Sequence, residues 1–282
     1  MKPDIKDIQN LIKLTLKEDC PSIDVTTNPL VPDDAKADFK IIAKEELISC
    51  GASIAKEFFL QLDSDFEWKQ IAKDGSLLHK GDIFLAGRGL VKAILTAERS
   101  ALNIVQRLSG ISTMTSQFVK VLEGTETKVL DTRKTTPGLR IFEKYAVAVG
   151  GGTNHRFGLS DMVLLKENHL KYEEQHGASY IGRAIKKCRE LYSDLKIEVE
   201  IQFVSQAEEA ALAGADIIML DNMSFSEIEE CINIINKRSK VEVSGGITLE
   251  TIRSFALPGV DFISVGALTH SVTAADLSLL LG

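Results

Sequence analysis

The chain has 282 residues, of which 44% are hydrophobic and 26% are charged. This balance excludes a disordered chain, and the length allows one large α/β domain or two smaller ones. The net charge of −7 argues against a general nucleic-acid binder, because phosphate backbones attract basic surfaces. Four cysteines without a CxxC pair are typical of reduced thiols in a cytoplasmic protein, and no apolar run has membrane-spanning length.

The first third of the chain mixes helices and short strands without a regular alternation. Apolar residues at helical spacing predict helices at residues 8–17 and 51–62. Alternating apolar and charged residues predict a strand at 37–43, and a short apolar run between turns predicts another at 83–87. We therefore expect a separate α+β domain.

A strong helical pattern follows at residues 90–108. Ser109 and Gly110 come directly after it and predict the end of that helix, because glycine is common just past helix ends. A second helix is expected at 115–122.

The rest of the chain has a repeating pattern. Short apolar runs, each ending in polar residues or glycine, recur at residues 128–130, 162–165, 197–201, 216–220, 240–243 and 261–265. Helical segments separate most of them, at 182–191, 207–213, 225–236 and 249–255. Such units predict a parallel sheet, either a barrel or a doubly wound sheet. No GxGxxG motif follows the first run, which favours a barrel.

Positive charge gathers in residues 131–171, where seven Lys and Arg residues face four acids. This stretch has a net charge of +3, so the remaining chain has −10. A compact basic site on an acidic protein suits a small anion better than a polymer.

Charged residues follow several of the predicted strands. Arg133 and Lys134 come after the first, Lys166 after the second, and Glu200 and Asp221 lie at the ends of the next two. Polar turns end most strands, but several ends with Lys, Arg, Glu or Asp are harder to explain in that way. In α/β barrels the active site lies at the carboxyl ends of the strands.

Two glycine-containing segments predict anion binding. Ser244, Gly245 and Gly246 precede a helix expected to begin near Thr248, and Gly266 follows the last strand; such turns bind phosphate at the last strand ends of many barrels. A structural turn is the alternative.

The second segment, residues 150–156, has three glycines followed by Thr, Asn, His155 and Arg156. A guanidinium fork with an imidazole donor can hold a planar carboxylate. The alternatives are a flexible loop and a core histidine.

Glu200 and Asp221 could hold ribose hydroxyls or coordinate Mg²⁺, directly or through water. They could equally pair with Lys166 and the arginines, and the two interpretations are compatible. Glu198 shares the face of Glu200 one layer deeper, which favours a structural role.

The motifs together resemble the signature of quinolinate phosphoribosyltransferases, the carboxylating nicotinate-nucleotide pyrophosphorylases. The resemblance is carried by residues 98–103, 108–113, 131–140, 143–147, 150–156, 164–169, 198–200, 220–222 and 244–247. It covers nearly the whole chain. One departure is visible at residues 20–27, where the family often has Gly before an Asp-x-Thr motif and this chain has Cys-Pro-Ser-Ile.

The resemblance implies an α/β fold with an N-terminal α+β sandwich domain at residues 1–112 and an open, incomplete α/β barrel of TIM type at 113–270. A C-terminal tail, 271–282, would pack back on the N-terminal domain. The implied reaction converts quinolinate and phosphoribosyl pyrophosphate into nicotinate mononucleotide, pyrophosphate and CO₂, with Mg²⁺, in de novo NAD biosynthesis. A cytoplasmic homodimer or larger assembly is implied, with no nucleic-acid or membrane partner.

The resemblance also implies residue roles. Arg133, His155, Arg156 and Lys166 would hold the quinolinate carboxylates, and Lys134 would assist them and the pyrophosphate. Arg99 would reach into the partner subunit's site. Glu200 and Asp221 would serve the ribose and the metal, and Ser244, Gly245, Gly246 and Gly266 would hold the 5′-phosphate. The catalytic set would be Lys134, Lys166, Glu200 and Asp221.

Three alternatives remain. The first is a phosphoribosyltransferase-like protein associated with molybdenum transport, which has the same fold. The second is a non-catalytic sensor of a phosphorylated metabolite, against which Glu200 and Asp221 argue. The third is a lyase or aldolase that uses Lys166 as a Schiff base, although dicarboxylate binding explains the arginines directly.

Overall fold

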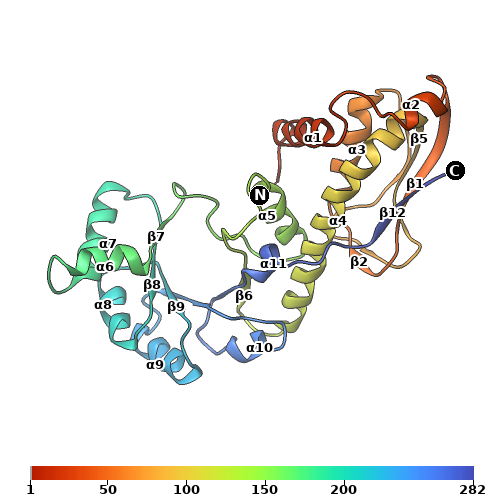
Figure 1. Cartoon of the computed structure of the whole chain (residues 1–282). Coiled ribbons are helices and arrows are strands. Elements are labelled where there is room, and N and C mark those ends of the chain that lie inside the picture. The colour runs from red at the N-terminus through yellow and green to blue at the C-terminus, as the bar shows by residue number, and fades with distance from the viewer. Residues whose placement is uncertain (1) are drawn as a thin grey trace. The chain divides into compact units, whose positions relative to one another are not determined.

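The computed structural model describes residues 2–282, which form two compact units (Figure 1). The first unit contains the residues up to Ser116 together with Thr135–Gly151 and Leu268–Gly282, and the second contains Gln117–Lys134 and Gly152–Ala267. The chain therefore passes between the units more than once. The domain boundaries at residues 112 and 270 stay predictions.

The first unit contains a four-stranded antiparallel sheet with the order β12-β1-β5-β3. Its strands are β1 (Lys36–Ala43), β3 (Glu67–Ile71), β5 (Ile83–Leu90) and β12 (Leu277–Leu281), and a small second sheet pairs β2 (Leu47–Ile48) with β4 (Leu77–Leu78). The strands expected at 37–43 and 83–87 are confirmed. The C-terminal strand β12 pairs with β1, with Phe39 opposite Leu281.

Helices α1 (Ile5–Asp19) and α3 (Ala52–Leu62) confirm the two expected near the N-terminus, and they pack against each other. Asp4 caps α1 by accepting the N–H groups of Lys6 and Asp7. The other helices of this unit are α2 (Thr27–Leu30), α5 (Arg140–Val149) and most of α11 (Ala267–His270). The rings of Phe39, Phe59, Phe66 and Trp68 pack with centroids 4.9–6.2 Å apart between sheet and helix.

The prediction that a helix ends at Ser109–Gly110 is wrong. One continuous helix, α4 (Val91–Val121), runs through both residues. A Cβ atom at Gly110 would lie 2.2 Å from the carbonyl oxygen of Thr273. The glycine is therefore required for close packing of the C-terminal segment on α4, and not for a helix end.

Arg107 on α4 anchors a buried carboxylate within the first unit. Its Nε lies 2.7 Å from Glu143 Oε1, and its Nη2 donates to Thr136 Oγ1 and the carbonyl oxygen of Thr269, both at 2.8 Å. Glu143 is fully buried, and its second oxygen accepts the N–H of Thr136. A buried charge that loses its partner is strongly destabilising.

We therefore expect Arg107→Ala to lower the free energy of unfolding by about 3–5 kcal/mol, measured by urea denaturation. The double variant Arg107→Ala, Glu143→Leu should recover much of that loss, because it removes the orphaned charge. Lys186→Ala is the control, since Lys186 forms an exposed ion pair with Glu190 at 3.9 Å. Equal losses for Arg107→Ala and Lys186→Ala would contradict the role given to the buried pair.

The second unit contains a six-stranded parallel sheet with the order β6-β11-β10-β9-β8-β7. Its strands, at the six predicted positions, are β6 (Lys128–Leu130), β7 (Val163–Leu165), β8 (Ile197–Ile201), β9 (Ile217–Asp221), β10 (Lys240–Ser244) and β11 (Phe262–Ser264). Each strand from β7 to β11 neighbours the next along the chain, and β11 neighbours β6. Within residues 2–282 the sheet does not close between β6 and β7, so the open α/β barrel is confirmed.

Helices connect the consecutive strands, and those that follow β7, β8 and β9 lie together beside these strands (Figure 1). They are α6 (Glu167–Glu174), α7 (Tyr180–Leu191), a 3₁₀ turn at Val204–Gln206, α8 (Ala207–Leu212), α9 (Phe225–Ile235) and α10 (Ile252–Phe255). None of the helices in the described part of the chain is long and apolar enough to cross a membrane.

The helix expected to begin near Thr248 starts instead at Ile252 and has four residues. The carbonyl oxygen of Thr248 still accepts the N–H groups of Thr251 at 3.2 Å and Ile252 at 2.9 Å, so a turn that leads into this helix begins at Thr248. The N–H of Thr248 donates to the Thr251 hydroxyl at 3.0 Å.

Candidate active site

Four predicted site residues of the second unit, Lys166, Glu200, Asp221 and Ser244, lie at the carboxyl ends of its strands. Glu200 on β8 is the register partner of Met219 on β9, and Met219 is the register partner of Glu242 on β10. Register partners point to the same face of a sheet. Asp221 and Ser244, one pleat further on, are also register partners. The structure thus brings the carboxylates and the Ser244 turn to one edge and one face.

The end of β6 is joined to the His155 segment through Asp131. Thr153 forms a parallel bridge with Leu130 beside β6. The Asp131 carboxylate is fully buried and accepts the His155 N–H and the Asn154 amide, both at 2.8 Å. The glycine-rich segment is therefore not a flexible loop at this point, because a buried carboxylate fixes its backbone.

Arg156 is held by its own segment. Its exposed fraction is 9%, and its Nη1 donates to the carbonyl oxygen of Met162 at 3.1 Å. The Asp161 carboxylate closes the intervening loop by accepting the N–H groups of Phe157 and Gly158. Burial and the neighbouring Arg133 charge lower the pKa of Arg156. Paired cations of this kind suit a ligand with adjacent negative charges.

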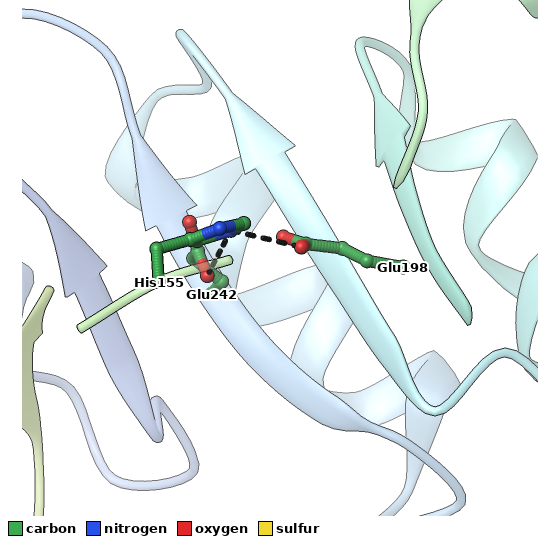
Figure 2. Close-up of side chains that lie close together, drawn as sticks. All are labelled: His155, Glu198 and Glu242. Carbon is green, nitrogen blue, oxygen red and sulfur yellow. Dashed lines mark ion pairs between the residues drawn. The ribbon is translucent and has the colours of Figure 1, made fainter. Parts of the chain in front are cut away.

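His155 lies between two carboxyl groups (Figure 2). Its Nε2 is 2.9 Å from Glu198 Oε2 and 3.7 Å from Glu242 Oε2, and its Nδ1 accepts the N–H of Arg156 at 2.7 Å. Glu198 and Glu242 are fully buried. Both ring nitrogens of His155 thus face protein groups, whereas the resemblance implied a direct contact with a substrate carboxylate.

The ligand atoms of His155, Glu198 and Glu242 lie within 4.8 Å of one another, which is close enough to hold a metal ion. The tautomer of His155 argues against such a site. Because Nδ1 accepts a hydrogen bond, the proton of a neutral ring is on Nε2, the nitrogen that would have to coordinate.

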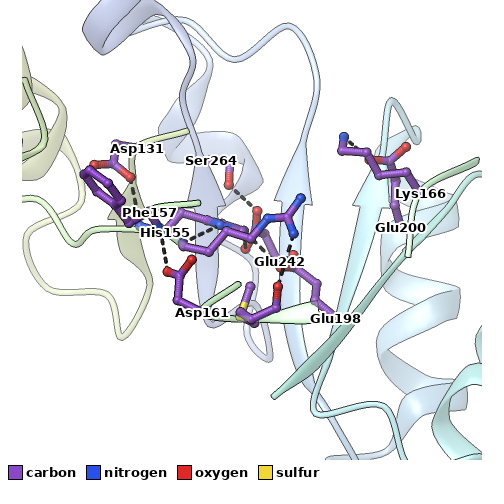
Figure 3. Close-up of polar contacts among 11 residues, drawn as sticks. Asp131, His155, Phe157, Asp161, Lys166, Glu198, Glu200, Glu242 and Ser264 are labelled. Atoms are coloured by element: carbon purple, nitrogen blue, oxygen red, sulfur yellow. Dashed lines mark hydrogen bonds and ion pairs between the residues drawn. The ribbon is translucent and has the colours of Figure 1, made fainter. Parts of the chain in front are cut away.

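Lys166 and Glu200 form a second polar group (Figure 3), with Lys166 Nζ 2.8 Å from Glu200 Oε2. The Lys166 side chain is 49% exposed, so its ammonium group can exchange this partner for a ligand. Asp221 is partly exposed, and one of its oxygens accepts from the Asn222 amide. The ion-pair interpretation of Glu200 therefore holds in this structure, and it leaves Asp221 the more accessible carboxylate.

The turn after β10 has the close approach that its glycines suggest. Gly245 has φ +107°, and a Cβ atom there would lie 2.2 Å from Asn222 Oδ1. The N–H of Asn222 donates to the carbonyl oxygen of Ser244 at 2.9 Å. The turns after β9 and β10 are thus packed on each other, beside Asp221.

Three further predicted site residues, Lys134, Gly266 and Arg99, lie in different parts of the structure. Lys134 is exposed after β6, and Gly266 follows β11 at the same edge of the sheet. Arg99 is exposed on α4 in the first unit, which contains none of the other predicted site residues.

Sequence reasoning missed Glu242 and Ser264. Ser264 is buried and donates to Glu242 (Figure 3). A signal was present, since Glu242 lies between two valines in a buried strand, as Glu198 lies between Ile197 and Val199. A carboxylate at such a position needs a specific partner.

A separate hollow of about 340 Å³ lies in the first unit. Its lining includes Lys92 and four residues of the segment 20–27, where the chain departs from the family pattern: Cys20, Ser22, Ile23 and Asp24. It contains no predicted site residue.

The site at the strand ends instead combines cationic groups, two carboxylates and a tight glycine turn, which suits a substrate with carboxylates at one end and phosphate at the other.

Residues 24–109 match the family model of the quinolinate phosphoribosyl transferase N-terminal domain, and residues 111–280 match that of the C-terminal domain. A probable nicotinate-nucleotide pyrophosphorylase (carboxylating) of Bacillus subtilis (strain 168) is 42% identical over 273 residues, covering 96% of this chain and 92% of that protein. A mitochondrial quinolinate phosphoribosyltransferase (decarboxylating) of Nicotiana tabacum is 36% identical, covering 97% and 82%. The crystal structure of NadC from Streptococcus pyogenes has a TM-score of 0.92 at 41% identity, covering 100% and 99%.

Proposed function

The chain belongs to the quinolinate phosphoribosyltransferase family, and on this premise we propose that it transfers the phosphoribosyl group of phosphoribosyl pyrophosphate to quinolinate. The products are nicotinate mononucleotide, pyrophosphate and CO₂, in de novo NAD biosynthesis. The observation that carries the proposal is the placement of Lys166, Glu200 and Asp221 at the carboxyl ends of β7, β8 and β9, in the unit that also contains Arg133 and Arg156.

Quinolinate has two adjacent carboxylates, and the clamp in this proposal is Arg133, Arg156 and Lys166. Guanidinium forks bind carboxylates through two parallel hydrogen bonds, which also fixes the plane of the ring. The burial of Arg156 strengthens such a contact, because little water competes for it. His155 contributes to the clamp through its neighbour Arg156.

In this proposal Glu200 and Asp221 act at the ribose end of the substrates. Positive charge develops on the anomeric carbon as pyrophosphate leaves, and Glu200 and Asp221 stabilise it. The quinolinate nitrogen then bonds to that carbon. Next, the bond to the carboxyl group beside the nitrogen breaks, its electrons enter the cationic ring, CO₂ leaves and the ring carbon takes a proton. Lys134 and Lys166 complete the catalytic set by neutralising the pyrophosphate and the carboxylates.

Mg²⁺ is the proposed cofactor at the ribose end. The donor set fits it, because Glu200 and Asp221 offer hard oxygen ligands from neighbouring strands on one face. Two carboxylates leave further positions for water and pyrophosphate oxygens, which is usual for this ion. When bound, Mg²⁺ would lower the charge of the leaving pyrophosphate. The 5′-phosphate is assigned to the turn of Ser244, Gly245 and Gly246, with Gly266.

The test is calorimetric titration of the purified protein with quinolinate and, as the matched control, with nicotinate, which lacks one carboxylate. We expect quinolinate to bind at least about tenfold more tightly, because the second carboxylate is charge-paired. Equal affinities for the two compounds, or no binding of either, would contradict the clamp and favour a protein of the same fold with another ligand.

Cytoplasmic location is proposed on the four free cysteines, of which Cys50 and Cys231 are buried.

We also propose a homodimer in which Arg99 reaches the partner's site. Arg99→Ala and Arg133→Ala should each be nearly inactive alone. Mixing them in equal amounts should restore about a quarter of wild-type activity, because half of the dimers carry one site with both arginines intact. Light scattering gives the oligomeric state. No restoration after confirmed subunit exchange would rule out a shared site.

A further inference from the structure

Four polar side chains are buried together inside the second unit, next to the proposed clamp. Glu198 and Glu242 have exposed fractions of 0%, Ser264 of 6%, and the His155 side chain of 7%. Two carboxyl groups in an apolar interior are costly unless hydrogen bonds satisfy them. The reaction proposed above uses neither Glu198 nor Glu242, so their presence requires another explanation.

One hydrogen bond sets which nitrogen of the His155 ring can donate. Its Nδ1 accepts the N–H of Arg156 at 2.7 Å, so the proton of a neutral ring is on Nε2. Nε2 lies 2.9 Å from Glu198 Oε2 but makes no aligned hydrogen bond to it. The ring thus lies between the backbone of Arg156 and the buried carboxyl groups.

The two carboxyl groups cannot both be ionised without leaving acceptors unsatisfied. In the described residues, neither oxygen of Glu198 nor Oε2 of Glu242 receives an aligned hydrogen bond, and the remaining oxygen of Glu242 accepts from Ser264. A proton on Glu242 supplies the missing donor to Glu198. Burial and the adjacent Glu198 charge raise the pKa of Glu242 well above its ordinary value, which agrees with a proton on Glu242. The Glu198 charge in turn attracts the Arg156 guanidinium.

We propose that Glu198 and Glu242 form a buried acid pair sharing one proton, which holds the His155 ring and positions Arg156 for a substrate carboxylate. The pair acts on Arg156 in two ways. Glu198 attracts the guanidinium directly, and His155 fixes the Arg156 N–H. Glu198, Glu242 and His155 are positioning residues. The role in quinolinate binding rests on the proposed function, whereas the placement of His155 against Glu198 and Glu242 does not.

The test compares substitutions that keep or remove the hydrogen bonds. In Glu242→Gln the amide can still donate to Glu198 and accept from Ser264, so the KM for quinolinate should stay within about threefold of wild type. In Glu242→Leu the donor is lost, and that KM should rise about tenfold or more, while the KM for phosphoribosyl pyrophosphate changes less than about twofold. Ile218→Val, whose side chain points to the opposite face of β9, is the matched control and should leave both values unchanged.

A second measurement does not depend on activity or on the stability of a variant. Nitrogen-15 NMR of the unsubstituted protein should show the neutral His155 ring with its proton on Nε2, with its signals identified by their loss in His155→Gln. An Nδ1–H tautomer would overturn the proposal. So would equal quinolinate KM values for folded Glu242→Gln and Glu242→Leu. If the unsubstituted protein has no turnover but shows the expected tautomer, the proposed function fails and the buried arrangement of His155, Glu198 and Glu242 stands.

Discussion

Asp221→Asn is expected to lower kcat by about 10²–10³-fold, while the KM for quinolinate changes less than about threefold. Asp221 lies at the end of β9 and is the more accessible of the two site carboxylates, since Glu200 is already paired with Lys166 at 2.8 Å. An amide keeps the shape of the side chain but loses the negative charge that would oppose the cationic ribose. The loss should therefore fall on the chemical step.

Steady-state kinetics with each substrate varied in turn measures this effect. Glu230→Gln on α9 is the control, because it removes one exposed carboxylate of the same unit away from the strand ends. A rise in quinolinate KM with unchanged kcat would instead place Asp221 at the dicarboxylate end of the site.

Arg156→Ala is expected to lower kcat/KM for quinolinate by about a hundredfold or more, since truncating one partner of a buried charge contact costs several kcal/mol. Arg156→Lys should lose about tenfold, because lysine keeps the charge but lacks the planar fork. Arg156 is 9% exposed and is tied to the Met162 carbonyl oxygen, so its guanidinium is held in one place before substrate binds.

The control is Lys171→Ala, which removes one exposed cation from the same basic stretch of 131–171. It should leave kcat/KM unchanged, because the effect belongs to the clamp and not to net charge. If Lys171→Ala and Arg156→Ala lose activity equally, general electrostatic attraction explains the stretch and the clamp is wrong.

The sequence predicted the strand ends of the barrel well, because a short apolar run followed by polar residues is a local signal. The run at 197–201 became β8 without a change of boundary. Local signals failed where a distant contact decides. Gly110 was taken as a helix end, but the chain near Thr273 requires the glycine in mid-helix.

The site residues divide in the same way into those that local sequence predicts and those that depend on distant contacts. Each cationic side chain could be assigned to a strand end from its position in the chain. The contacts of His155 could not, because Glu198 and Glu242 are 43 and 87 residues further along and meet it only in the folded sheet. The sequence indicated a carboxylate ligand for His155, whereas folding provides two protein carboxyl groups instead.

The central claim is tested most directly by following the carboxyl carbon that is lost. Quinolinate labelled in the carboxyl group beside the ring nitrogen is incubated with the protein, phosphoribosyl pyrophosphate and Mg²⁺. We predict that labelled CO₂ and nicotinate mononucleotide form in equal amounts, and that neither forms when phosphoribosyl pyrophosphate is omitted. Nucleotide that retains the label, formed without CO₂ release, or no turnover by protein shown to be folded, would contradict the account.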